Sequence, residues 1–319
     1  MIKIQFCDFH REYNIKNSIF LDVIKNELQE EYVISEEPDF LIFSCEGTQH
    51  LKYKNCVKIF YTNEPVTPNF NECDYAIAYD DIQFGNRYFK RPYFFNSEYP
   101  APIKLQDAEL LNRKFCNFVY SNDTRGSGAK LRKQFALELM KYKHIDCPGK
   151  VLNNMKDAIQ PRHNDWRKGK HEFIQNYKFT IAFENCSMLG YTTEKLEDPF
   201  CAHSVPIYWG NPDVFNYFNK NSFIYCDGTP EGILQTIEQV KFLDTNDNAY
   251  LDMLHEKPIN VIGNTKEDMR QFLKDIFSNK SKQVENDALN LWSQMTIPDY
   301  SEKELFEKLV KKIKYVISK

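Results

Sequence analysis

The chain has 319 residues, of which 42% are hydrophobic and 15% aromatic, and its formal net charge is -4. This composition excludes a disordered chain. The small negative charge also excludes the global positive field of nucleic-acid-binding proteins, so no nucleic-acid partner is expected. A chain of this length suits two domains of ordinary size.

The cysteines and the N-terminus bear on the compartment. The chain has 9 cysteines, none of them in a C-x-x-C pair with zinc-ligand spacing. Several lie inside apolar runs, where a free thiol behaves as a small buried hydrophobe. Neither a signal-peptide-like apolar region nor an apolar run of membrane-spanning length is found. We therefore expect a cytoplasmic protein.

The first third of the sequence alternates strand-like apolar runs with a helix-like segment. Such alternation is typical of parallel strands joined by crossover helices. A stretch with three prolines and no helical period, Tyr88 to Leu105, follows and is the best candidate for a linker. The predicted strands lie at residues 1–6, 40–44, 57–62 and 75–79, and the predicted helix lies at 18–30.

A second alternating series follows the predicted linker. Its strands are predicted near residues 115–121, 179–183, 206–210 and 223–227, and its main helices at 129–143, after Tyr191, at 229–241 and at 246–256. We predict an α/β fold with two Rossmann-like domains facing a cleft, residues 1–105 and 106–300. The carboxyl ends of parallel strands are where such sheets bind ligands.

Residues 301–319 form a separate C-terminal segment with the pattern of a basic amphipathic helix. One interpretation is that its apolar stripe packs on the body of the protein. The other is that it rests peripherally on an anionic membrane, at the inner face of the plasma membrane. The apolar residues at helical spacing are Leu305, Phe306, Leu309, Val310, Ile313, Val316 and Ile317, and the lysines are Lys308, Lys311, Lys312, Lys314 and Lys319.

The run from Tyr177 to Pro212 has the layout of a ligand site. An apolar strand is followed by a polar turn, and Thr192-Thr193 can cap a helix whose first turn holds Glu194 and Lys195. Backbone N–H groups and the helix dipole favour an anion there, and Lys195 adds a positive charge. The predicted ligand is a phosphate or a diphosphate.

Three elements of this run carry a family resemblance: Phe183-Glu184-Asn185, Tyr191-Thr192-Thr193-Glu194-Lys195 and Val205-Pro206-Ile207-Tyr208-Trp209-Gly210. Together they resemble the donor-binding signature of the α1,3-fucosyltransferases. The segments FYTNEPVTPNF, DYAIAYDD and NAYLDMLHEKPIN are similar to the bacterial, Helicobacter-like branch of that family. The resemblance covers about residues 55 to 262.

The resemblance implies a GT-B type glycosyltransferase that acts with inversion. Its donor would be GDP-fucose, and L-fucose would pass to the 3-hydroxyl of GlcNAc or Glc in a lactosamine-type or lactose-type oligosaccharide acceptor, as in Lewis x-type glycans. No acidic pair of the chain stands in a convincing metal-binding context. We therefore expect neither a metal ion nor another cofactor, because cations and a helix N-terminus can hold the leaving diphosphate.

Glu64 is the predicted catalytic base. It follows the apolar strand VKIFYT directly, so it lies at the carboxyl end of a strand, and Pro65 restricts its backbone. The resemblance places the family's proposed base at the same position. Its neighbours Tyr61 and Asn63 either shape the sugar or acceptor pocket or, as is common for an aromatic at a strand end, belong to the core.

Lys195 and Arg132 are the predicted phosphate-binding cations. Arg132 lies early in a predicted helix that follows a strand, and the resemblance maps the family's diphosphate-binding arginine there. The positive charges of Arg125, Lys130 and Lys133 are close enough in sequence to be confused with it.

Asn185, Tyr191 and Glu194 complete the donor site that the resemblance implies. The Asn185 amide and the Tyr191 hydroxyl would bind phosphate or sugar, and the Glu194 carboxylate would bind the ribose hydroxyls. Alternatively, Glu194 only stabilises the first turn of its helix. Glu184 either contacts fucose or terminates its strand. Pro199 departs from a regular helix and predicts a kink or a shortened helix after Lys195.

Two other interpretations of the whole chain remain. One is a transferase of the same fold that uses a different nucleotide sugar. The other is a non-catalytic glycan-binding relative. The presence of Glu64, Arg132, Glu194 and Lys195 together disfavours the second, because a chain without catalysis has no chemical need for a base and a phosphate clamp.

Overall fold

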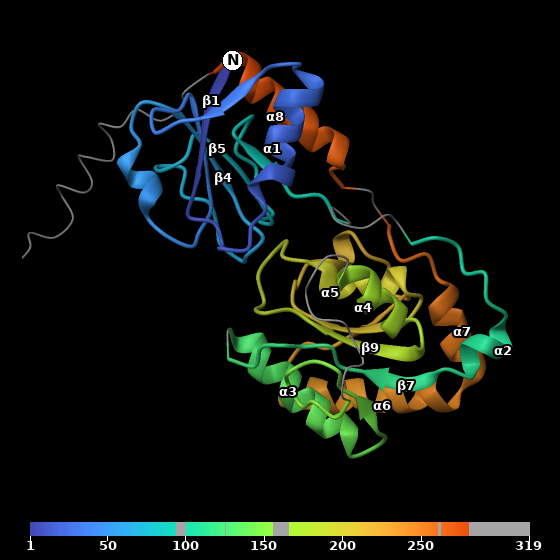
Figure 1. Cartoon of the computed structure of the whole chain (residues 1–319). Coiled ribbons are helices and arrows are strands. Elements are labelled where there is room, and N and C mark those ends of the chain that lie inside the picture. The colour runs from blue at the N-terminus through green and yellow to red at the C-terminus, as the bar shows by residue number, and fades with distance from the viewer. Residues whose placement is uncertain (94–99, 125, 156–165, 261–262, 281–319) are drawn as a thin grey trace, which may run out of the picture. The chain divides into compact units, whose positions relative to one another are not determined.

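The computed structural model describes residues 1–93, 100–124, 126–155, 166–260 and 263–280 (Figure 1). The predicted helix at residues 301–319 lies outside the described residues. The chain is divided into two compact units. Of the described residues, the first contains Met1–Tyr61, Pro68–Ala76 and 274–280, and the second contains Thr62–Thr67 and those within Ile77–Leu273.

The N-terminal sheet has six strands in the order β2-β1-β3-β4-β5-β6. β1 pairs in parallel with both β2 and β3, and β3 pairs in parallel with β4. The sequence pattern missed β2 and β6, and β6 lies inside the segment predicted to be a linker. The strands are β1 Ile2–Cys7, β2 Tyr32–Ile34, β3 Phe40–Phe43, β4 Val57–Tyr61, β5 Tyr75–Ala78 and β6 Tyr88–Lys90.

Every residue of β3, β4 and β5 is buried, as expected for parallel strands covered on both faces. Helix α1 covers Ile19–Asp22, capped by Ser18, and continues as a π-helical turn over Val23–Glu27. Helix α8, Lys266–Asn279, contributes Phe277, whose ring meets Phe40 of β3 edge-on at 4.9 Å. The end of α8 therefore belongs to the first unit. Short 3₁₀ turns lie at Ile15–Asn17 and Gln49–Lys52.

The second sheet has five strands in the order β11-β10-β9-β7-β8, and all four pairings are parallel. The predicted parallel α/β architecture is thereby confirmed for this part of the chain. The strands are β7 Lys114–Asn117, β8 Ile145–Asp146, β9 Tyr177–Phe183, β10 Val205–Trp209 and β11 Ile224–Tyr225.

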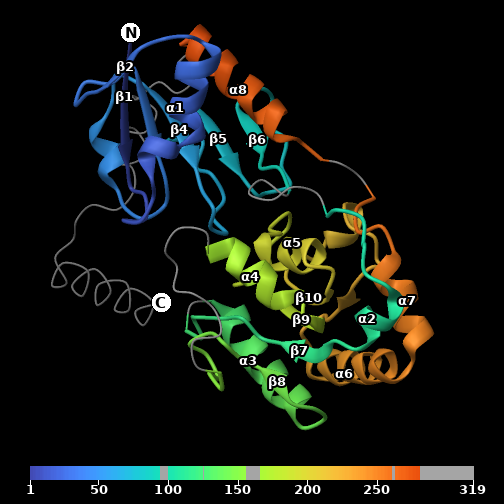
Figure 2. The same cartoon turned by 45° about the vertical axis from the view of Figure 1, so that its right-hand side comes forward.

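Helices cover both faces of the second sheet. Alternate residues of β9 point to opposite faces: Ala182 packs with Leu196 of α5, whereas Phe183 packs with Phe135 of α3. Figures 1 and 2 show α4 and α5 together on one face and α3 and α6 on the other. The helices are α2 Asp107–Leu111, α3 Ser127–Met140, α4 Trp166–Ile174, α5 Glu194–Cys201, α6 Pro230–Thr245 and α7 Asp247–His255, with a 3₁₀ turn at Val214–Asn216.

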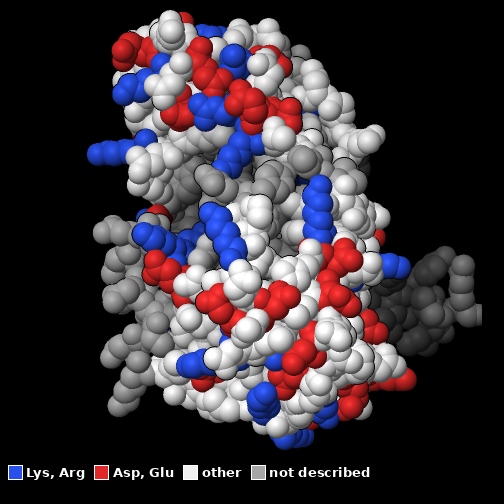
Figure 3. All heavy atoms as spheres, turned by 90° about the vertical axis from the view of Figure 1, so that its right-hand side faces the viewer, with Lys and Arg blue, Asp and Glu red and all other residues white. Residues whose placement is uncertain are grey.

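Basic and acidic side chains are intermixed over the face shown in Figure 3. In the part of the chain that the structure describes, no helix combines the length and apolar character needed to cross a membrane. All nine cysteines are free thiols.

Candidate functional site

The candidate site lies where β9 ends and α5 begins. Glu184 and Asn185 follow the last residue of β9, at the carboxyl edge of the parallel sheet. Thr193 has extended backbone angles and caps α5, since its side chain accepts a hydrogen bond from the Lys195 N–H. The predicted order of strand, turn, cap and helix is what the structure contains.

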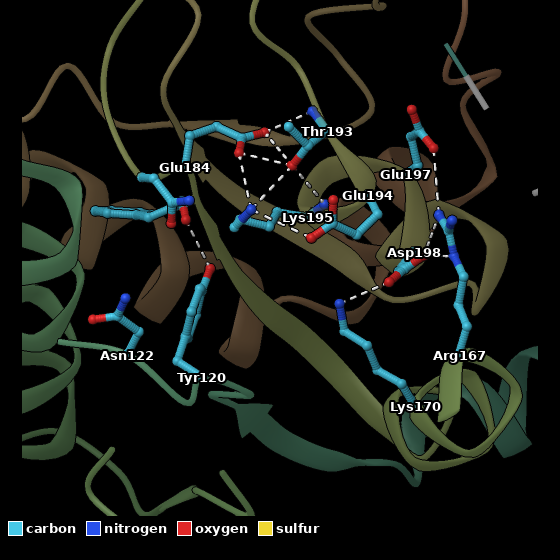
Figure 4. Close-up of polar contacts among 12 residues, drawn as sticks. Tyr120, Asn122, Arg167, Lys170, Glu184, Thr193, Glu194, Lys195, Glu197 and Asp198 are labelled. Carbon is cyan, nitrogen blue, oxygen red and sulfur yellow. Dashed lines mark hydrogen bonds and ion pairs between the residues drawn. The ribbon is translucent and has the colours of Figure 1, made fainter. Parts of the chain in front are cut away.

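Glu184 connects the end of β9 to the start of α5 (Figure 4). Its carboxylate is completely buried and accepts hydrogen bonds from the Thr193 N–H at 2.8 Å and from the Thr193 hydroxyl at 2.8 and 3.0 Å. Lys195 Nζ lies 3.4 Å from Glu184 Oε2. These contacts connect Glu184 to the N-terminus of α5. They favour a structural role at the end of the strand over a contact with fucose, the other role predicted for Glu184.

Two opposite charges lie side by side in the first turn of α5. Lys195 Nζ is 3.3 Å from Glu194 Oε1. Burial by itself lowers the pKa of Lys195, but the charges of Glu194 and Glu184 outweigh it and hold the pKa well above its usual value. Burial likewise raises the pKa of Glu194, but the charge of Lys195 reverses this shift and the pKa falls to about 2. Both groups are therefore ionised at neutral pH.

Helix α3 brings Arg132 to the same place. Its Nη1 donates to Asn185 Oδ1 at 3.1 Å, its Nη2 donates to the carbonyl of Asn122, and the guanidinium lies 4.2 Å from the ring centre of Tyr120. Arg132 is almost completely buried, and its Nε has no hydrogen-bond partner among the described residues. Buried donors are rarely left unpaired, so this nitrogen can donate to a further acceptor.

Two glycines allow α3 to approach β9 closely. Gly126 has φ +80°, a left-handed conformation that favours glycine. The Gly128 N–H donates to the Asn185 carbonyl at 3.0 Å, and a Cβ on Gly128 would lie 2.1 Å from the Glu184 carbonyl oxygen. Because that neighbour is backbone, a side chain at Gly128 must push α3 away from the end of β9.

Gly128→Ala is therefore expected to lower the free energy of unfolding by about 1–3 kcal/mol, the usual cost of overpacking. It should also weaken nucleotide binding, because Arg132 moves with α3. Gly169→Ala in α4 is the matched control, since a Cβ there meets nothing within 4 Å. Urea unfolding of both variants tests this, and equal stabilities would contradict the close packing of α3.

Asn185 and Tyr191 differ in exposure. Asn185 is half-buried and holds Arg132 through its side chain and Gly128 through its carbonyl. Tyr191 is almost completely buried, and burial raises the pKa of its hydroxyl. The hydroxyl is therefore neutral at physiological pH and can donate a hydrogen bond. Both side chains lie in the segment that joins β9 to α5.

The loop after β4 carries the predicted base. Glu64 is exposed, and its backbone N–H donates to the Thr62 hydroxyl at 2.9 Å, which fixes the start of the loop. Asn63 is also exposed and accepts a hydrogen bond from the Arg91 guanidinium. Tyr61 is buried, and its ring meets Phe20 edge-on at 5.3 Å. The core interpretation therefore fits Tyr61, whereas Asn63 and Glu64 are open to solvent.

Cys186 follows Asn185 in the segment that joins β9 to α5. Burial raises the pKa of its thiol, and the carboxylates of Glu184 and Glu64 raise it further. Glu64 and Cys186 both belong to the second compact unit.

The arrangement offers two cations and the N-termini of two helices around Glu184 and Asn185. Such a set suits an anion, because helix dipoles and positive side chains stabilise negative charge together. An incoming anion would compete with Glu184 and Glu194 for Lys195 Nζ. Among the described residues, no three or more His, Cys, Asp or Glu side chains are grouped so as to hold a metal ion.

A set of polar side chains on α4 was missed in the sequence. Arg167, Lys170 and His171 all contact Asp198 of α5. Their positions i, i+3 and i+4 share one helix face, so a periodicity count of charges in this helix would have found them. Asp198 could not have been identified as their partner from the sequence, because only the folded chain brings α4 and α5 into contact.

Two α/β units built on parallel strands, with two cations at the carboxyl edge of one sheet, are the architecture of a GT-B type glycosyltransferase. Residues 112–290 match the family model "Glycosyltransferase family 10 (fucosyltransferase) C-term". Residues 4–96 match the model "Alpha-(1,3)-fucosyltransferase FucT N-terminal domain". The chain belongs to glycosyltransferase family 10, the fucosyltransferases, which confirms the predicted family.

Several known proteins are similar to the chain. Alpha-(1,3)-fucosyltransferase FucT of Helicobacter pylori is 33% identical over 248 residues, covering 66% of this chain and 49% of that protein. Human GDP-fucose protein O-fucosyltransferase 3 is 27% identical over 201 residues, covering 62% of this chain and 41% of that protein. The chain thus spans about half the length of these relatives, or less.

Solved structures support the same family. A crystal structure of an alpha1,3-fucosyltransferase superposes with a TM-score of 0.71 at 28% identity, covering 89% of this chain and 92% of that one. A crystal structure of alpha1,3-fucosyltransferase with GDP-fucose gives a TM-score of 0.69 at 28% identity and the same coverage. The predicted fold class is confirmed.

Proposed function

We propose that the protein is an inverting α1,3-fucosyltransferase. It would transfer L-fucose from GDP-fucose to the 3-hydroxyl of GlcNAc or Glc in lactosamine-type or lactose-type acceptors, producing Lewis x-type glycans. The observation that carries this proposal is the set of charges around Glu184 and Asn185, where Arg132 and Lys195 converge at the starts of α3 and α5. The crystal structure of a related enzyme with GDP-fucose supports this choice of donor.

The leaving diphosphate would be held by Lys195 and Arg132. Lys195 Nζ would exchange its contacts with Glu194 and Glu184 for phosphate oxygens, and a phosphate oxygen would satisfy the unpaired Nε of Arg132. Charge that develops on the diphosphate as the glycosidic bond breaks would be stabilised by these cations and by the dipole of α5.

The acceptor hydroxyl would be activated by Glu64. An exposed carboxylate at the end of β4 can take the proton as the hydroxyl oxygen attacks the anomeric carbon. Attack from the face opposite the leaving diphosphate inverts the anomeric configuration. The Glu194 carboxylate would accept hydrogen bonds from the ribose hydroxyls of GDP, a role that its ionised state permits.

A product assay tests the proposal. Purified protein is incubated with GDP-fucose and with lactose, type 1 or type 2 acceptors, and the linkage of the product is determined by NMR. We expect fucose on the 3-hydroxyl of Glc or of the type 2 GlcNAc. Calorimetric titrations with GDP, UDP and CDP separate the alternatives: tighter binding of UDP or CDP indicates another nucleotide sugar, and GDP binding without any product indicates a non-catalytic relative.

Transfer should continue in EDTA. The proposed diphosphate site uses Lys195, Arg132 and two helix N-termini, so chelation is expected to change the initial rate by less than about twofold, whereas an essential Lewis acid would supply several kcal/mol. The measurement compares initial rates with EDTA and with added Mn²⁺. Complete loss of activity in EDTA, restored by Mn²⁺, would contradict the proposed role of the cations.

A further inference from the structure

Next to the candidate site, α4 and α5 meet at a buried carboxylate. Asp198 lies in α5, one turn after Glu194, and its side chain is completely buried. Lys170 Nζ contacts Asp198 Oδ2 at 2.7 Å, whereas Arg167 Nη2 and His171 Nε2 contact Oδ1 at 2.7 and 2.9 Å. Figure 4 shows Arg167 and Lys170 reaching from α4 toward Asp198.

These contacts hold the two helices together strongly. A buried carboxylate without partners is very unfavourable, so Asp198 requires the positive groups of α4 in the folded protein. Arg167 also contacts Glu197 Oε2 at 3.4 Å, which adds a second attachment to α5. The position of α5 on the sheet therefore depends on α4.

Pro199 makes this dependence greater. Proline has no N–H, so the carbonyl of Lys195 lacks the hydrogen bond that a regular helix would supply four residues later. The helix nevertheless continues through Pro199 and ends at Cys201, so that it has 8 residues. With one backbone bond missing, side-chain contacts must hold the first turn: Thr193 with Glu184 on one side and the Asp198 contacts on the other.

Charge connects the same groups to Glu194. Burial raises the pKa of Glu194, and the positive charges that lower it are those of Lys195 first, then Lys170 and Arg167. Lys170 thus acts on Glu194 through space while it hydrogen-bonds Asp198. Its side chain is only 12% exposed, so solvent screens this interaction little.

We propose that Lys170 is a positioning residue for the donor carboxylate: by binding Asp198 it fixes the first turn of α5 so that Glu194 meets the ribose hydroxyls of GDP. This inference rests on the proposed function, because it assumes that Glu194 binds the donor. Lys170 itself does not touch the nucleotide in this account. Arg167 and His171 share the binding of Asp198 but approach its other oxygen.

The test compares two nucleotides on wild type and three variants. GDP and 2′,3′-dideoxy-GDP, which lacks both ribose hydroxyls, are titrated by calorimetry against wild type, Lys170→Met and Lys170→Arg. Lys168→Met is the matched control, because Lys168 is exposed on the same helix. Wild type should prefer GDP, and in Lys170→Met this preference should fall by about 3- to 10-fold, the size of coupling within one salt-bridge network.

The ratio of the two affinities separates positioning from general loss of structure. A purely structural effect of Lys170→Met would weaken both nucleotides equally and leave the ratio unchanged, which would overturn the inference. Lys170→Arg, which keeps the charge and the contact, should restore most of the preference, and Lys168→Met should behave as wild type. If Lys170→Met does not fold, Lys170→Gln replaces it, and the preference should again fall, because a neutral amide binds a buried carboxylate less strongly than an ammonium group does.

Failure of the inference can be told apart from failure of the proposed function. If wild type binds GDP and prefers it to the dideoxy nucleotide, but Lys170→Met and Lys170→Gln keep that preference, only the role of Lys170 is wrong. If wild type binds both nucleotides equally, Glu194 does not bind ribose and the inference falls while GDP binding stands. If wild type binds no GDP, the proposed function fails and the inference fails with it.

Discussion

Glu64→Gln should remove most transfer activity while leaving GDP binding nearly unchanged. The substitution keeps the size of the side chain and deletes only its ability to take a proton, and a positioned base typically contributes ~10²–10⁴-fold. We therefore expect kcat to fall by that factor. Because Glu64 is exposed, the melting temperature should stay the same. Initial rates and calorimetric titration with GDP measure the two effects.

Glu37→Gln is the control for this substitution, since Glu37 is also an exposed glutamate of the N-terminal sheet region. It should transfer fucose at the wild-type rate. Turnover of Glu64→Gln near that of wild type would eliminate Glu64 as the base. A large loss of GDP affinity would instead assign Glu64 to donor binding.

Lys195→Ala should reduce both GDP affinity and turnover. A cation that faces the leaving diphosphate binds it in the ground state and binds the larger charge of the transition state more strongly, so its removal should raise KM and lower kcat. Removing one stabilising group of this kind typically costs ~10²–10³-fold in kcat. Loss of a charge-assisted contact should weaken GDP binding by about 1.5–3 kcal/mol. Steady-state kinetics and GDP titration test both.

The same substitution also acts on stability. Glu184 is completely buried and would lose its only cationic partner among the described residues, although Thr193 still donates to it. Binding must therefore be measured well below the melting temperature of the variant. Lys141→Ala, an exposed lysine at the end of α3, is the control. If Lys195→Ala binds GDP as tightly as wild type does, Lys195 is not the cation that binds the diphosphate.

The elements of this fold that the sequence predicted are long and apolar. β3, β4, β9 and β10 are continuous buried runs, and such runs identify parallel strands without any knowledge of their neighbours. β2 and β6 were missed because they are three residues long and partly exposed. Strands of this kind are defined by pairing with a neighbour, as β2 is by β1, and not by a pattern in their own sequence.

The layout of the segment from Glu184 to Lys195 was predictable for a similar reason. Glu184, Asn185, Thr193, Glu194 and Lys195 lie close together in the chain, so strand end, cap and first helical turn can be inferred from local rules. The choice between the roles of Glu184 could not be made in this way. It depended on the burial of its carboxylate against Thr193, which the fold decides.

By itself, the sequence determined the parallel α/β character, the family and the order of strand end, cap and helix start between Glu184 and Lys195, because each follows from local periodicity or from a contiguous motif. Only the tertiary structure decided which distant groups meet. Arg132 reaches Asn185 across 53 positions and Lys170 reaches Asp198 across 28, and Phe277 of α8 packs on Phe40 of the first unit. Such contacts are selected by burial of apolar surface and by the need to pair buried charges, which are properties of the folded chain as a whole.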